Sequence, residues 1–222
     1  MRALLAVLLL APAAARAAPA ESCVELKGVG CVYAPSGSGG SLPLLVYLRG
    51  HHPRYAAAVP AGEALASARQ AFSFYGLGDA ADAAGHAVLV TYRSGLAVTE
   101  ADAARAASAA GVTFTRRVVA AHSGGYVGLG ATLAGGLSFE RVIMLDDFYS
   151  SSPALAQQVQ ARFPADACMG YYTPHIAAVF EAVFRPNAPG CRVERLGPND
   201  HNAGVNRCLA GYLRGRPCSS PR

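Results

Sequence analysis

The body of the chain alternates short apolar runs with longer Ala-rich stretches. The apolar runs predict strands over Leu44–Leu48, Ala87–Tyr92, Val118–His122 and Val142–Leu145, with two weaker candidates over Cys168–Tyr172 and Arg192–Leu196. The stretches between them predict helices over Gly62–Tyr75, Thr99–Ala110, Tyr126–Ala134, Pro153–Arg162, Pro174–Phe184 and about Ala203–Leu213. Runs that are apolar at every position suit strands buried on both faces. We therefore expect an α/β fold, with a mostly parallel central sheet, helices on both faces and ligands bound beyond the carboxyl ends of the strands.

The first residues carry the features of an export signal. Arg2 supplies a positive charge, Ala3–Ala15 is a short apolar run, and small residues follow it. This pattern predicts a signal peptide over residues 1–20, cleaved after Ala17 or Ala20. A retained membrane anchor or a lipoprotein is the alternative, but no Cys stands at the cleavage point. We expect a secreted or periplasmic protein in which residues 21–222 form one domain, with no membrane span in the mature chain.

The cysteines fit an exported protein. All six lie in the expected mature chain, at Cys23, Cys31, Cys168, Cys191, Cys208 and Cys218. An even number of cysteines in such a chain predicts disulfides. Spacing does not fix the connectivity, so pairing each cysteine with its neighbour along the sequence is a working hypothesis. Buried free thiols are the alternative for some of them.

The charge of the chain is mildly positive. The formal net charge is +5, and the basic residues are scattered rather than clustered. No stretch interleaves them with aromatic side chains in the way that a nucleic-acid groove does. We therefore expect no nucleic-acid partner, and we expect a monomer.

The most informative segment is the junction between a predicted strand and a predicted helix. The apolar run Val118–His122 leads into Ser123-Gly124-Gly125, and a helix follows. This order predicts a nucleophile elbow, a tight turn that exposes a serine hydroxyl and tolerates only small neighbours. Ala121 replaces the glycine that usually comes first. Ser123 is the candidate nucleophile, and a Gly-rich turn with an inert serine is the alternative.

Two segments could stabilise negative charge beside Ser123. The backbone N–H of Gly124 lies at the expected helix start, where unpaired amides and the helix dipole favour an anion. The second donor should come from the loop after Leu44–Leu48, and we assign it to His51 or Gly50. His51 and His52 have an alternative interpretation as metal ligands, but adjacent histidines point apart and no Asp, Glu or Cys accompanies them. We expect no metal and no cofactor.

The general base should lie late in the chain, after the last strand. His201 occupies that place, between the predicted strand Arg192–Leu196 and the last helix. The other histidines suit the role less well, because His86 opens a strand, His122 flanks the elbow and His175 opens a helix. A surface histidine without a role is the alternative for His201.

An acid must accept a hydrogen bond from the base. Its usual place, after the penultimate strand, begins with Thr173 and offers no carboxylate. One strand earlier, Val142–Leu145 is followed by Asp146 and Asp147. We choose Asp146 as the acid and keep Asp147 as the alternative, because Asp200 lies too near His201 in sequence. A turn residue without a catalytic role is the alternative for Asp146.

The segments Ala121–Tyr126, which read A-H-S-G-G-Y, and Leu145–Tyr149, which fit L-D-x-x-Y, resemble those of small exported bacterial serine hydrolases of the α/β-hydrolase superfamily. The resemblance implies Ser123, Asp146 and His201 as a catalytic triad. The shortness of the chain leaves little room for a large lid, so we expect a minimal lid or none. Three features depart from the family pattern: Ala121 itself, Arg49 in place of the histidine before Gly50, and the early position of the acid.

From these residues we expect hydrolysis of a carboxylic ester, in a small molecule or a polymer, through an acyl-enzyme and without a cofactor. An amidase or peptidase acting on cell-envelope material is the alternative within the same fold. A non-catalytic binding module on a degenerate hydrolase scaffold is the alternative outside enzymology.

Overall fold

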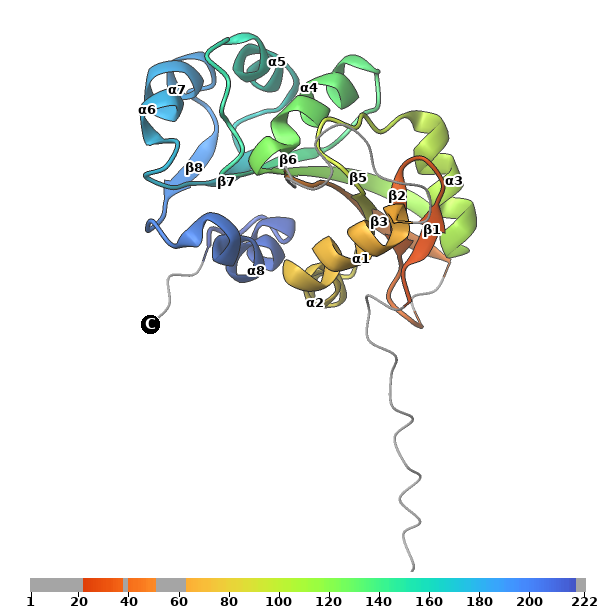
Figure 1. Cartoon of the computed structure of the whole chain (residues 1–222). Helices are drawn as coiled ribbons and strands as arrows, with labels where there is room; N and C mark the ends of the chain where they lie inside the picture. The colour runs from red at the N-terminus through yellow and green to blue at the C-terminus, as the bar shows by residue number, and fades with distance from the viewer. Residues whose placement is uncertain (1–21, 38–39, 51–62, 219–222) are drawn as a thin grey trace, which may run out of the picture.

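The computed structural model describes residues 22–37, 40–50 and 63–218, so the predicted signal peptide lies outside the described residues. The described residues build an eight-stranded sheet with the order β1-β2-β4-β3-β5-β6-β7-β8 (Figure 1). The strands are β1 (Val24–Leu26), β2 (Gly30–Tyr33), β3 (Ser41–Leu48), β4 (Ala87–Thr91), β5 (Thr113–His122), β6 (Arg141–Leu145), β7 (Cys168–Tyr172) and β8 (Arg192–Arg195). β2 runs antiparallel to β1 and β4, and every pair from β4 across to β8 is parallel. The predicted sheet class is confirmed.

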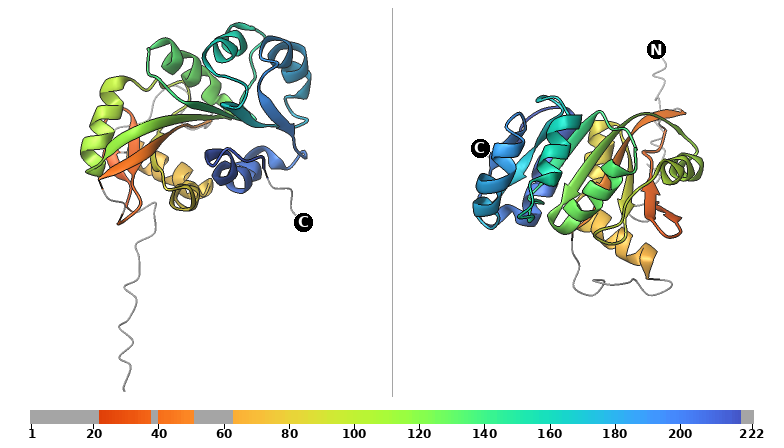
Figure 2. Two further views of the ribbon diagram at one scale, coloured as in Figure 1. Left: turned by 180° about the vertical axis from the view of Figure 1, so that it is seen from behind. Right: turned by 90° about the horizontal axis from the view of Figure 1, so that it is seen from above.

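Helices cover both faces of this sheet, as Figures 1 and 2 show. One face carries α1 (Ala64–Phe74), α2 (Leu77–Ala84) and α8 (Asp200–Leu213). The other face carries α3 (Glu100–Ala110), α4 (Tyr126–Ala134), α5 (Ala154–Arg162) and the short helices α6 (Ala177–Val179) and α7 (Arg185–Asn187), with a π-helical turn over Phe180–Phe184 between the last two. In the described part of the chain, no helix is long and apolar enough to cross a bilayer.

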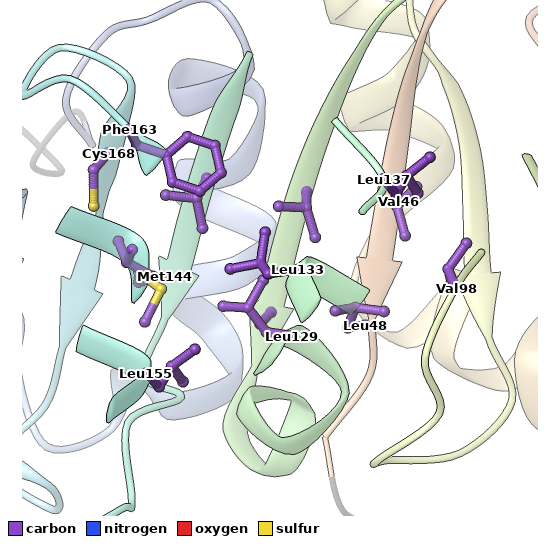
Figure 3. Packing of buried hydrophobic residues seen from close by; sticks show 14 of the residues in the cluster. Val46, Leu48, Val98, Leu129, Leu133, Leu137, Met144, Leu155, Phe163 and Cys168 are labelled. Atoms are coloured by element: carbon purple, nitrogen blue, oxygen red, sulfur yellow. The ribbon is translucent and has the colours of Figure 1, made fainter. Parts of the chain in front are cut away.

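Successive residues of the central strands face opposite sides of the sheet. Along β5, Val119 and Ala121 pack in the cluster beneath α3, α4 and α5, whereas Val118 and Ala120 pack in the cluster beneath α1, α2 and α8. All four are fully buried. Figure 3 shows part of the first cluster, including Leu129 of α4. Burial on both faces is the reason that the strands contain apolar residues without alternation.

Three disulfides join cysteines that are close in sequence. Cys23–Cys31 closes the β1–β2 hairpin, Cys168–Cys191 links the start of β7 to the residue before β8, and Cys208–Cys218 ties α8 to the segment that follows it. These are the pairs expected from sequence neighbourhood.

The structure differs from the sequence prediction in two helical regions. Helix α2 was not predicted, because Gly76 marks the end of the preceding helix in the sequence pattern. In the structure Gly76 adopts a left-handed conformation (φ 59°), and α2 begins at the next residue. The predicted helix Pro174–Phe184 instead begins at Ala177 and continues to Asn187, as α6, the π-helical turn and α7 in succession. Pro186 has no N–H to donate to the preceding turn, which prevents one regular helix through this region.

Candidate active site

Ser123 lies where β5 turns sharply into α4. Its φ is 53°, in the left-handed region that costs a residue with a side chain on the order of 1 kcal/mol. Gly125 allows this turn, because a Cβ atom there would lie 2.3 Å from the carbonyl oxygen of Leu48. The strained turn therefore has the geometry of the nucleophile elbow predicted from the sequence.

The backbone after β3 approaches Ser123 closely at Gly50. A Cβ atom on Gly50 would lie 2.7 Å from Cβ of Ser123 and 3.3 Å from its hydroxyl oxygen. Gly124 follows Ser123 in the helical turn and lines the same cavity. Of the three residues predicted to stabilise an oxyanion, Gly50 and Gly124 thus adjoin Ser123, whereas His51 lies outside the described residues, as does its neighbour His52.

His201 and Asp146 form a direct pair. Nδ1 of His201 lies 2.6 Å from Oδ2 of Asp146, whose side chain is 0% exposed. Thr173 supplies two more hydrogen bonds to this carboxylate, one from its backbone N–H at 2.7 Å and one from its hydroxyl at 2.8 Å. Burial opposes ionisation of Asp146, but the hydrogen bonds from His201 and Thr173 outweigh it and lower the pKa of the carboxyl. Asp146 is therefore a carboxylate that fixes the His201 ring by its Nδ1–H.

The main chain of His201 is also held by two buried side chains. Its carbonyl oxygen accepts hydrogen bonds from the hydroxyl of Tyr171 at 2.9 Å and from Nε2 of His122 at 3.0 Å. Because a carbonyl can only accept, Nε2 of His122 must carry the proton. Burial, with the charge of His201 adding to it, lowers the pKa of His122 to about 3, so this ring is neutral near pH 7. The last residue of β5 is thereby hydrogen-bonded to the main chain of His201.

The roles of Thr173, Tyr171 and His122 were not predicted from the sequence. Thr173 was passed over because it is not a carboxylate, and His122 because it precedes the elbow. The only signal available was position. His122 ends β5, Tyr171 and Thr173 lie at the end of β7, and polar side chains converge at the carboxyl ends of parallel strands.

The two candidate acids differ sharply in their surroundings. Asp147 is 1% exposed, and within the described residues its Oδ2 has no hydrogen-bond partner. Burial and the neighbouring Asp146 carboxylate raise the pKa of Asp147 well above its usual value. These surroundings disfavour a charge on Asp147, and it is the carboxylate of Asp146 that contacts His201.

An open cavity of about 520 Å³ joins these groups. It is lined by Ser94, Ser123, Gly124, Tyr126, Val127, Tyr149, His175 and His201. The phenol of Tyr149 interacts with the Ser123 hydroxyl, and this interaction lowers the pKa of the phenol. Burial has the larger, opposite effect, so the pKa is raised to about 12. In the described residues no hydrogen bond joins Ser123 to His201, although both face the cavity.

No protein-family model matches the sequence, and no curated protein matches it. Solved structures do match the fold. An S-formylglutathione hydrolase from Agrobacterium tumefaciens has a TM-score of 0.57, with 13% sequence identity, over 85% of this chain and 89% of that chain. A substrate-bound, fluorophosphonate-binding serine hydrolase F from Staphylococcus aureus has a TM-score of 0.56, with 12% identity, over 86% of this chain and 95% of that chain. At such identities the likeness establishes a shared fold and leaves the chemistry to the site itself.

Proposed function

The chain has the α/β-hydrolase fold, and we propose that it is an exported serine hydrolase that cleaves carboxylic esters. Ser123 is the nucleophile, His201 the general base and Asp146 the acid. One observation carries this proposal: Nδ1 of His201 lies 2.6 Å from a fully buried carboxylate, and its ring lines the same cavity as the strained Ser123. The reaction class follows from these groups, since a hydroxyl, an imidazole and a carboxylate suffice for acyl transfer.

In the proposed reaction, the Ser123 hydroxyl turns from Tyr149 to Nε2 of His201 when an ester binds. Apo active sites often have catalytic hydrogen bonds that form only with substrate present. Oγ attacks the acyl carbonyl while Nε2 takes its proton, and Asp146 stabilises the imidazolium. The bond to the leaving alcohol then breaks, and the alcohol oxygen takes the proton from His201. Water attacks the acyl-enzyme with the same base, which releases the carboxylic acid and restores the Ser123 hydroxyl.

Negative charge on the carbonyl oxygen needs preorganised donors. We assign these to the backbone N–H of Gly124 and that of Gly50 or His51. The close approach of Gly50 to Ser123 supports this assignment, because a backbone segment can reach the reacting carbon only where no side chain intervenes.

Export rests on the N-terminal sequence and on the cysteines. The signal-peptide pattern of residues 1–20 and three disulfides are together typical of proteins from an oxidising compartment. The open cavity favours short acyl groups over long ones, because a long chain in an open site would remain exposed to water.

The proposal is tested by labelling the purified protein with a fluorophosphonate probe. We expect the wild-type chain to be labelled and Ser123→Ala to be unlabelled, since only an activated serine reacts. Ser108→Ala is the matched control, because Ser108 is an exposed serine in α3 that does not line the cavity, and this variant should keep the label. Equal labelling of Ser123→Ala and wild type would refute the nucleophile, and an unlabelled wild type would favour a binding module.

A second assay measures acyl-chain preference with p-nitrophenyl esters. We expect the acetate and butyrate to be hydrolysed faster than the octanoate. Turnover of long-chain esters alone would contradict the assignment of an open, short-acyl site.

A further inference from the structure

A second hollow of about 460 Å³ lies beside the cavity that holds Ser123. The two hollows share Tyr126 and Val127, so a ligand bound at Ser123 can continue across α4 into the second one. We call this second hollow the distal groove. It lies along α4 and α5, and the residues used below are Tyr126, Val127, Gly130, Ser150, Ser152 and Gln158.

No charged side chain lines the distal groove in the described part of the chain. This is notable because Asp, Glu, Lys and Arg make up 15% of the sequence and the net charge is +5. The ionisable side chains that line the adjoining cavity are His175, His201 and two tyrosines. A ligand that spans both hollows would therefore bind without charge pairing, which indicates that the ligand is uncharged.

The polar groups of the groove are hydroxyls and one amide. The hydroxyl oxygen of Ser150 accepts from the N–H of Ser152 at 3.0 Å, and that of Ser152 accepts from the N–H of Ala154 at 3.3 Å. In the described residues neither hydroxyl proton has an acceptor, so both remain available as donors, and the amide of Gln158 adds donors and an acceptor. A fatty chain in this groove would offer these groups no hydrogen-bond partner. Hydroxyls on the ligand would satisfy them.

Apolar surface accompanies these polar groups. Val127 is 53% exposed, an unusual state for a valine, and it lies between the two hollows. Tyr126 stands beside it, with its ring centroid 6.2 Å from that of Tyr149. Aromatic faces and aliphatic groups beside hydroxyl and amide donors suit pyranose rings, which present C–H faces and hydroxyl edges.

We propose that the substrate is an O-acylated neutral polysaccharide, with its ester at Ser123 and its sugar chain extending over Val127 into the distal groove. This inference rests on the ester hydrolysis proposed above. The bond cleaved is the one between the acyl carbon and a sugar hydroxyl oxygen, and water converts it into a free sugar hydroxyl and a carboxylic acid.

The test uses Gly130→Leu to fill the groove. A Cβ atom on Gly130 would meet only Cδ1 of Leu155, at 3.9 Å, so a larger side chain extends into the groove without displacing backbone. Ala131→Leu is the matched control, because it adds a leucine one position along α4 at an exposed site outside the groove. The readout is the ratio of kcat/KM for acetylated xylohexaose and mannohexaose to kcat/KM for p-nitrophenyl acetate.

We expect Gly130→Leu to lower this ratio about tenfold through KM, equivalent to about 1.4 kcal/mol of lost binding, and Ala131→Leu to leave it near the wild-type value. An unchanged ratio in Gly130→Leu for both hexaoses would overturn the proposal. A selective loss on p-nitrophenyl octanoate would overturn it in favour of an acyl-chain groove.

Binding without turnover separates this inference from the proposed function. In the Ser123→Ala background, calorimetry should detect acetylated xylohexaose or mannohexaose, and Gly130→Leu should weaken that binding. Binding with no hydrolysis by the wild type would refute the ester hydrolase and leave the groove assignment standing. Absence of binding by both hexaoses would refute the groove.

Discussion

Replacing His122 should remove a defined part of the acid sensitivity of the fold. The ring is buried, and its pKa falls from 6.5 to about 3 on folding. Between these two pH values the unfolded chain binds a proton at His122 that the folded chain does not. Stability is therefore full above about pH 6.5 and declines as the pH falls toward 3, by about 1.4 kcal/mol per pH unit at most. From pH 7 to pH 5 this residue alone should cost the wild type about 2 kcal/mol.

Urea unfolding at pH 7, 6 and 5 measures this effect, followed by far-UV circular dichroism because the chain contains no Trp. His122→Gln should lose about 2 kcal/mol less than the wild type over that interval, since a glutamine amide donates a hydrogen bond but does not titrate. His175→Gln is the matched control, because it makes the same substitution at an exposed histidine. Parallel pH profiles for wild type and His122→Gln would refute the reasoning.

The same position reports on catalysis. His122→Phe removes one of the two donors to the His201 carbonyl, so we expect kcat on p-nitrophenyl acetate to fall about tenfold with KM little changed. His122→Gln should recover most of that loss.

Three further changes have defined outcomes. Asp146→Asn should reduce kcat on the order of 10³-fold with a near-native far-UV spectrum, because an amide cannot stabilise the imidazolium; a loss under tenfold would remove Asp146 from the triad. Gly50→Ala should lower kcat on the order of 100-fold, because its Cβ atom would lie 2.7 Å from Cβ of Ser123, and an unchanged kcat would contradict that contact. Replacing both Cys208 and Cys218 with serine should lower the free energy of unfolding by about 3 kcal/mol, as expected for a short closed loop. Differential scanning calorimetry measures this change, and an unchanged unfolding temperature would contradict it.

The sheet and the elbow could be predicted because local sequence encodes them. A strand buried on both faces is apolar at nearly every position. The apolar runs Leu44–Leu48 and Val118–His122, which form the carboxyl-terminal parts of β3 and β5, could therefore be recognised in the sequence. The run at Ser123 is equally local, since only small residues fit where Gly125 meets the Leu48 carbonyl. The first half of β5, from Thr113 to Arg117, escaped prediction because its residues are mostly polar and it pairs with β3 in a partly exposed region.

The surroundings of His201 and Asp146 could not be predicted in the same way. Thr173 reaches Asp146 from the end of β7, and Tyr171 and His122 reach the His201 carbonyl from two different strands. Such contacts depend on strand order and register, which no short sequence window contains. Position alone favoured Asp146 over Asp147 as the candidate acid. The structure adds a physical reason, because His201 and Thr173 donate hydrogen bonds to Asp146, whereas Oδ2 of Asp147 has no partner among the described residues.

The distal groove and the reacting groups belong to different layers of the molecule. Ser123 and Asp146 are fixed by the ends of buried strands, whereas Gly130 and Gln158 lie on the flanks of two covering helices. Under the proposed function, substitutions on those flanks should change which polymer binds and leave the reacting groups in place. A library confined to these helix positions would make the chain a scaffold for evolving new specificities, with little risk to the sheet beneath.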